Sequence, residues 1–159
     1  LRSGINLIQA NINNIQINEA KEVIPMIDIQ YTIETEQYGN KTGNRLFIPA
    51  NIFRKGFTTP DLKQRVQDIH INYGYLDTDS ICLQIPEGYT IESLPKTCQV
   101  TSSFGSFSSS LMIKDKEICI IHRLLMHRGI YPKEIYKDFL EFRKQIAAQY
   151  SSKIILKKE

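Results

Sequence analysis

Residues 85–96 read IPEGYTIESLPK, and this stretch decides the fold class. Pro86 and Gly88 favour a tight turn, the alternation of Tyr89 and Ile91 with polar residues favours a short strand, and Pro95 ends that strand. Short strands separated by turn residues are typical of antiparallel sandwiches and barrels. The stretch contains no reactive group, so it predicts architecture and no chemistry.

Strand-like alternation continues on both sides of this stretch. Ile5 with Leu7 and Ile15 with Ile17 alternate with polar residues, which suits half-buried strands. We expect further strands at about 26–38, 45–49, 66–76, 80–85, 89–92, 97–104, 107–113, 117–126 and 153–158. The glycines and asparagines at 39–40 and 43–44 predict a hairpin between 26–38 and 45–49. Asp77, Thr78 and Asp79 are expected to form another turn.

One helix is predicted near the C-terminus, over about 132–149. Pro132 suits a first helical position. Ile135, Phe139, Phe142 and Ile146 recur at three- and four-residue spacing and form one apolar stripe. An isolated helix of this length is marginally stable, so we expect the stripe to pack on a sheet. The prediction is a mainly β chain, an antiparallel β-sandwich of about eight strands with one C-terminal α-helix packed on it.

Composition is that of one ordinary globular domain. The 159 residues are 42% hydrophobic and 23% charged, and a chain of this length buries about 68–70% of its unfolded surface around one core. A net charge of +3, evenly scattered, gives no reason to expect a nucleic-acid partner. No apolar run reaches the roughly 18 residues of a membrane span. Because the chain starts at Leu1, we expect it to be part of a longer protein.

Three cysteines and three histidines are the candidates for chemistry. A nucleophilic thiol is usually activated at a helix N-terminus beside a histidine, and Cys82, Cys98 and Cys119 all lie in predicted strands. Alternation within 117–126 places Cys119 and His122 on opposite faces. Cysteine often serves as a small buried hydrophobe. We therefore expect three free, buried, structural thiols, although an exported protein could form one disulfide.

Metal and modification motifs are sparse. The sequence has no CxxC or HxxxH spacing, and Asp77 with Asp79 lacks the glycine and distal glutamate of a calcium loop. We expect neither a metal site nor a cofactor. Asn40-Lys41-Thr42 fits a glycosylation acceptor but also fits a turn. Ser80, within Asp79-Ser80-Ile81, is a candidate O-glycosylation site.

A family resemblance supplies what these patterns leave open. The chain resembles the C-terminal region of the exported multidomain transglutaminase-like proteins of Gram-negative gut bacteria. The resemblance covers roughly residues 25–159. It is carried by YGNKTGNRLFIP (38–49), LQIPEGY (83–89), SLPK (93–96), FGSF (104–107), RGIYPKEIY (128–136) and FRK (142–144).

The resemblance implies a role within a larger protein. In such proteins a β-rich domain of unknown function follows a papain-like transglutaminase core, and that core carries the catalytic Cys, His and Asp. None of the residues in this chain is assigned to the triad. The implied partner is the core of the same polypeptide, the implied location is the periplasm or the cell surface, and the implied function is that of a non-catalytic accessory domain.

Two surfaces are candidates for binding. The loop at 51–60 carries Phe53, Arg54, Lys55 and Phe57, a composition enriched at interfaces, and we expect it to contact the rest of the parent protein or to plug one end of the sandwich. The alternative function is a module that binds a cell-surface glycan or protein. Glycan binding needs exposed aromatic residues, and we expect the candidate pairs Tyr73 with Tyr75 and Phe104 with Phe107 to be core instead.

Overall fold

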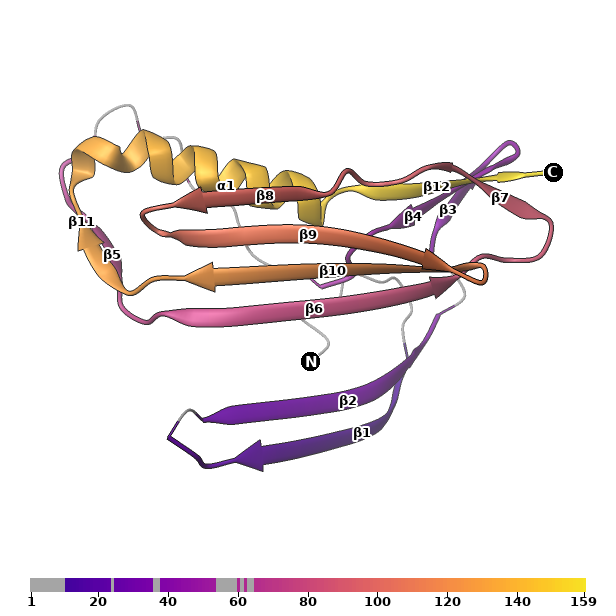
Figure 1. Ribbon diagram of the computed structural model, residues 1–159, viewed down its shortest axis with the longest axis horizontal. Helices are drawn as coiled ribbons and strands as arrows, with labels where there is room; N and C mark the ends of the chain where they lie inside the picture. The colour runs from indigo at the N-terminus through magenta and orange to yellow at the C-terminus, as the bar shows by residue number, and fades with distance from the viewer. Residues whose placement is uncertain (1–10, 24, 36–37, 54–59, 61, 63–64) are drawn as a thin grey trace.

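The computed structural model describes residues 11–23, 25–35, 38–53, 60, 62 and 65–159 (Figure 1). Antiparallel strands dominate this part of the chain, and one α-helix precedes the last strand. In chain order the elements are β1 (Asn11–Ala20), β2 (Met26–Glu34), β3 (Asn40–Thr42), β4 (Arg45–Pro49), β5 (Ile69–Ile71), β6 (Tyr75–Gln84), β7 (Tyr89–Ser93), β8 (Cys98–Ser102), β9 (Gly105–Lys114), β10 (Glu117–Met126), β11 (Gly129–Tyr131), the 3-10 helix η2 (Lys133–Ile135), α1 (Tyr136–Tyr150) and β12 (Lys153–Lys158).

Within the described residues, the strands form two four-stranded sheets and two two-stranded ones. The main sheet has the order β6-β10-β9-β8, and the second sheet has the order β3-β4-β12-β7. β1 pairs with β2, and β11 pairs with β5. A mainly β chain with antiparallel sheets and a C-terminal helix is thereby confirmed. The strands of the described ranges are more numerous than the eight expected, and they belong to four sheets.

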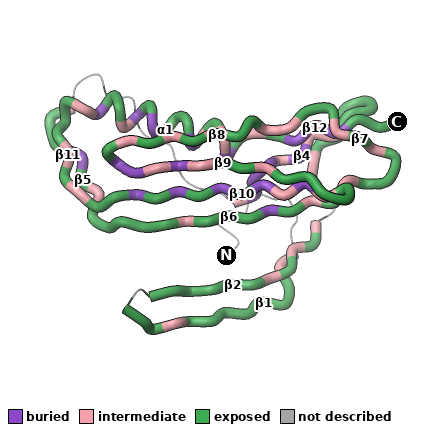
Figure 2. Tube along the Cα trace, viewed as in Figure 1, coloured by how far each residue is buried: buried purple, intermediate pink, exposed green. Residues whose placement is uncertain are grey.

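The core lies on one face of the main sheet. Alternation along β10 buries Ile118, Ile120, His122, Leu124 and Met126 and leaves the residues between them on the other face (Figure 2). This buried face meets two partners. One end packs on the second sheet through a sheet cluster, and the other end packs on α1 through a helix cluster. The sheet cluster is Ile48, Ala50, Ile118, Ile120, Ile154 and Leu156, and the helix cluster is Ile69, Phe104, Phe107, Leu124, Met126, Tyr136, Leu140, Phe142, Ile146 and Tyr150.

The predicted helix exists, but its first turn is a separate 3-10 helix. Phe142 and Ile146 are buried as expected. Phe139 is only half-buried, with its ring edge-on to Phe104 at 5.0 Å between centroids. Ile135 is also half-buried and belongs to η2. The apolar stripe packs on the sheet, with its centre more deeply buried than its N-terminal end.

Residues 85–96 adopt the predicted turn and strand. The backbone N–H of Tyr89 donates to the carbonyl of Pro86 at 3.2 Å, and Gly88 has a φ of 74°, a conformation that glycine adopts without steric cost. β7 follows the turn and pairs with β12. The final strand at 153–158 is confirmed as β12.

One predicted hairpin and one predicted turn are wrong. Residues 26–34 pair with β1 and not with 45–49, which instead pairs with β3 and β12. Asp77, Thr78 and Asp79 do not form a turn, because they lie inside β6 opposite Leu124, Arg123 and His122. Their polarity suggested a loop, but pairing with β10 and the hydrogen bond from Asn51 to Asp79 keep them in the strand. The expected alternation at Ile5 and Leu7 lies outside the described residues.

The β1–β2 hairpin stands apart from the core. None of its described residues is buried (Figure 2). Ile17 opposes Ile29 and Ile12 opposes Ile33, so one face of the hairpin is apolar and the other carries residues such as Gln16 and Gln30. Hydrophobic faces of hairpins are normally covered by another layer. The described part of the chain contains no helix with the length and apolarity needed to cross a membrane.

Candidate functional site

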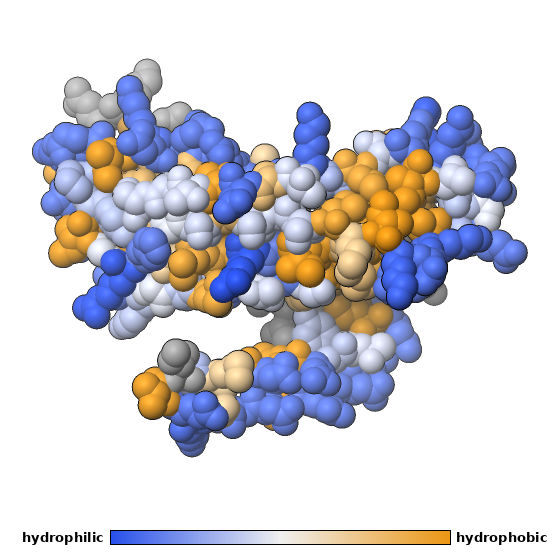
Figure 3. All heavy atoms as spheres, in the orientation of Figure 1, coloured by the Kyte–Doolittle hydropathy of each residue, from blue (hydrophilic) through white to orange (hydrophobic). Residues whose placement is uncertain are grey.

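A groove of about 530 Å³ separates the hairpin from the main sheet. Residues 29–31 and 33 of β2 form one wall, and residues 80–83 of β6 form the other. Tyr38, Ile52 and Phe53 also line it. Figure 3 shows the surface hollowed here, with apolar atoms on the margin of the hairpin that faces the main body. The volume is within the range of ligand-binding clefts.

A buried polar network holds the part of the lining that comes from residues 51–53. The side-chain amide nitrogen of Asn51 lies 3.1 Å from His122 Nδ1 and 3.3 Å from Asp79 Oδ2, and its Oδ1 accepts from the backbone N–H of Phe53 at 2.7 Å. Because Oδ1 is the acceptor for Phe53, the nitrogen must be the donor to the histidine. His122 Nδ1 is then the acceptor of this hydrogen bond.

The imidazole of His122 is also enclosed by aromatic rings. The imidazole is 1% exposed, its centroid lies 5.7 Å from that of Phe107, and Tyr150 meets it edge-on at 5.0 Å. Burial is the main reason that the pKa of Tyr150 is raised, followed by the negative charges of Asp79 and Asp77. A histidine enclosed in this way is out of reach of a substrate. Its role is to join the 51–53 segment to the sheet.

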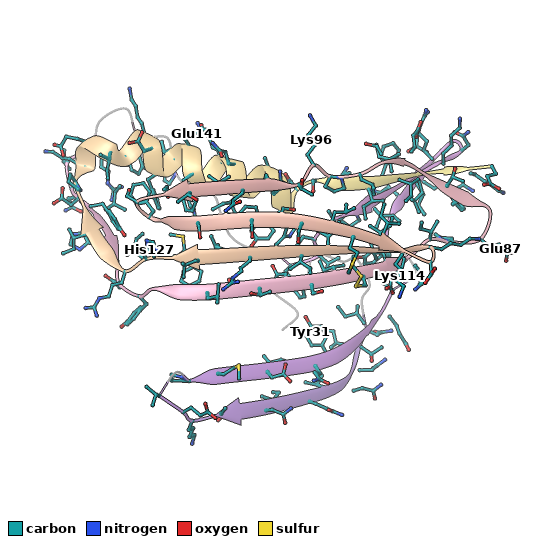
Figure 4. The ribbon with its side chains drawn as sticks, in the orientation of Figure 1. Tyr31, Glu87, Lys96, Lys114, His127 and Glu141 are labelled. Carbon is teal, nitrogen blue, oxygen red and sulfur yellow. A yellow bond between two sulfur atoms is a disulfide. The ribbon has the colours of Figure 1, made fainter. Side chains whose placement is uncertain are left out.

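Tyr31 lines the groove and lies within electrostatic range of Asp79, a member of this network. It extends from β2 toward β6 (Figure 4). Its pKa is raised mainly by burial and further by the negative charge of Asp79. The hydroxyl therefore stays protonated well above neutral pH and can donate a hydrogen bond inside the groove.

The cysteines correct an expectation from sequence. Cys82 and Cys119 lie directly opposite each other in β6 and β10 and form a disulfide, with their Cα atoms 4.1 Å apart. Both face away from the core, and Cys82 is exposed. The expectation of free, buried thiols is wrong for these two cysteines, because the register of β6 on β10 brings them together on the outer face. Cys98 is free, as expected, and the separation of Cys119 from His122 onto opposite faces is confirmed.

The remaining thiol is that of Cys98 in β8, which is half-buried beside the helix cluster. Burial raises its pKa, and a backbone hydrogen bond from Ser109 opposes that rise. A raised pKa lowers the thiolate fraction and with it the nucleophilicity. The Cys82 and Cys119 sulfurs gather with the carboxylate of Glu117, but sulfurs joined in a disulfide are not the thiolates that bind metal ions.

Some of the candidate binding residues line the groove, and others lie outside the described residues. Phe53 lines the groove, whereas Arg54, Lys55 and Phe57 lie outside the described residues. Ser80 is exposed on β6, and it also lines the groove.

The two aromatic pairs differ in burial. Phe104 and Phe107 are core, as expected. Tyr73, 81% exposed, and Tyr75, 42% exposed, are not, because Tyr73 precedes β6 and Tyr75 begins it, at the edge of the main sheet.

The polar residues around His122 and the groove were not predicted from the sequence. Asn51 was placed in a crossover loop, Asp79 in a turn and Tyr31 in a hairpin strand with no stated contact. One local signal was present for Asp79, since Asp77, Asp79, Ile81 and Leu83 alternate with residues of the other face as in a strand. The meeting of Asn51, Asp79 and His122 has no local signal, because 28 and 71 residues separate the bonded pairs.

Residues 44–156 match the model of a family described as a domain of unknown function with a solved structure, DUF3858. No curated protein and no solved structure gives a significant match to the chain.

Proposed function

The chain belongs to the DUF3858 family, and from this premise we propose that it is a non-catalytic accessory domain of a larger transglutaminase-like protein. The catalytic Cys, His and Asp belong to a papain-like core elsewhere in the same polypeptide. That core is the partner of this domain. The parent is an exported protein of a Gram-negative gut bacterium, located in the periplasm or at the cell surface.

The state of the cysteines is the observation that carries the proposal. Papain-like chemistry needs a thiolate paired with a histidine. Two sulfurs are joined in a disulfide, and the pKa of the third thiol is raised by burial. His122 lies on the face of β10 opposite Cys119, enclosed by Phe107 and Tyr150. These features support a structural use of all three cysteines.

The disulfide also supports an exported location. Disulfides persist in oxidising compartments such as the periplasm and are rare in reducing ones. Cys82 is exposed, so a cytosolic reductant would have access to the bond. A protein that relies on this bond is best suited to the periplasm or to the cell surface.

The test combines the reading frame with an activity assay. We expect the complete reading frame to encode a papain-like core before residue 1, and we expect this chain alone to give no amine incorporation or amide hydrolysis, oxidised or reduced. A reading frame without such a core contradicts the accessory role. Turnover by the isolated chain that disappears on Cys98→Ala contradicts the non-catalytic role.

A second candidate function is a module that binds a cell-surface glycan or protein. The observation that favours it is the exposure of Tyr73 and Tyr75, since exposed aromatic rings are the usual platforms for sugar rings. A glycan array with the wild-type chain and Tyr73→Ala tests it. Binding that is lost in Tyr73→Ala supports a glycan-binding module. If no glycan on the array binds, none of the tested sugars is a ligand.

A further inference from the structure

The two strands that face each other across the groove each have an unpaired edge. Within the described ranges, β6 pairs only with β10 and β2 only with β1. Residues 80–83 and 29–31 line the groove consecutively. Consecutive side chains of a strand point to opposite faces, so a wall made of consecutive residues is a strand edge. The groove is therefore bordered by main-chain groups on both sides.

The strand directions are those of an antiparallel sheet with one strand missing. Figure 1 shows β2 and β6 running in the same direction along the groove. β1 is antiparallel to β2, and β6, β10, β9 and β8 alternate in direction. One strand running the opposite way in the groove would be antiparallel to both of its neighbours. It would join the hairpin and the main sheet into one continuous sheet.

The disulfide reveals which main-chain groups of β6 face the groove. Directly opposite residues of an antiparallel pair have Cα atoms about 5.5 Å apart when they are hydrogen-bonded and about 4.5 Å apart when they are not. The 4.1 Å between Cys82 and Cys119 fits the second kind. Cys82, and Ser80 two residues before it, therefore direct N–H and C=O away from β10. Ile81 and Leu83 bond to β10 instead.

The part of the β6 edge that lines the groove lacks the usual protection. Exposed edge strands are commonly blunted by charged side chains, proline or a bulge. The aspartates of β6, Asp77 and Asp79, precede residues 80–83, which contain no charged residue and no proline, and β6 pairs with β10 without a register shift. Apolar side chains, including Ile29, Ile33 and Phe53, form much of the lining, while Gln30 and Ser80 border the groove with polar groups.

We propose that this groove docks an extended segment of a partner polypeptide, which adds as a strand antiparallel to both β2 and β6. The lining fits a strand of about five residues, roughly 17 Å long, with apolar side chains alternating with polar ones. Main-chain hydrogen bonds supply the affinity and the apolar lining selects the alternate side chains, as in other cases of strand addition. The proposal holds whether or not the parent is transglutaminase-like.

Amide exchange measured by NMR tests the proposal on the intact chain. The probe is a capped octapeptide of alternating valine and threonine, and the control is the same peptide with N-methylated valines, which cannot donate their main-chain hydrogen bonds. We expect the probe to slow exchange of the outward amides of Ser80 and Cys82 at least tenfold. The amides of Ile81 and Leu83, already bonded to β10, should change little, and the methylated peptide should have no effect.

A pair of proline variants sharpens the test. Ser80→Pro removes one outward donor without breaking a bond to β10 and should weaken probe binding at least fivefold. Thr78→Pro alters the same edge, two residues beyond the lining, and should bind as the wild type does. Equal binding by the two variants, or equal binding of both peptides, overturns the proposal. Circular dichroism shows whether each variant is folded. If either variant does not fold, the exchange measurement on the wild type alone tests the proposal.

Two further outcomes would overturn the choice of occupant. Outward amides that are slow in the free chain and become fast on dilution would identify a second copy of the chain. Outward amides that become fast only after deletion of residues 1–10 would identify a segment of the chain itself.

Discussion

Removing the Cys82–Cys119 disulfide should lower the free energy of unfolding by about 3.8 kcal/mol. The bond links residues 37 apart. In the chain-entropy description, closing a loop of that length removes about 13 cal/mol/K from the unfolded chain. The loss is a large part of a domain stability of roughly 5–15 kcal/mol. For a chain of this size it corresponds to a melting temperature about 8–15 °C lower.

Urea denaturation measures the effect, followed by circular dichroism because the chain has no tryptophan. The variant is the double substitution Cys82→Ser with Cys119→Ser, and the matched control is Cys98→Ala, which keeps the disulfide. Dithiothreitol should lower the unfolding midpoint of the wild type and of Cys98→Ala by similar amounts. It should leave the double variant unchanged, because that variant has no bond to reduce.

Two results would refute this reasoning. Titration of the denatured, unreduced chain with a thiol-reactive dye should find one thiol, that of Cys98, and finding three would show that the disulfide is absent. An unfolding midpoint that dithiothreitol does not change, in a chain shown to be oxidised, would show that the bond does not restrict the unfolded state.

Three further predictions concern the core, the tyrosines and the glycines. Phe142→Ala should lower the free energy of unfolding by about 3–5 kcal/mol, because this side chain is 2% exposed. Phe139 is half-buried, so Phe139→Ala should lower it less. Equal urea midpoints for the two variants would contradict the packing of α1. The free energy of unfolding should fall as pH rises above about 10. Tyrosines ionise there in the unfolded chain, whereas burial raises the pKa of Tyr38 and Tyr150 in the folded chain. Denaturation measured at several pH values should show a smaller fall for Tyr150→Phe. Gly105→Ala should prevent folding, since φ is 148° and an added Cβ would overlap the carbonyl of Leu125. At Gly88 an added Cβ meets open space, so Gly88→Ala should cost only about 1–2 kcal/mol of backbone strain. Thermal melts of the two variants distinguish these outcomes.

The sequence by itself determined the kinds of element and several of their ends. The tight turn at Gly88, the strand at 117–126, the helix stripe at Phe142 and Ile146 and the last strand could all be predicted, because each depends on residues a few positions apart. Alternation within a single strand was also enough to place Cys119 and His122 on opposite faces. The presence of a groove was not predicted, although three residues of its lining, Phe53, Ser80 and Cys82, had been singled out for other reasons.

Only the tertiary structure decided which strands are neighbours and in what register. Residues 26–34 pair with β1 and not with 45–49, and Asp79 stays in β6 opposite His122. The register of β6 on β10 brings Cys82 to Cys119 and, through Asn51, anchors the 51–53 segment beside the groove. The physical reason is that alternation is a property of one strand, whereas pairing depends on which distant apolar faces bury each other, and a shift of one residue would exchange the two faces.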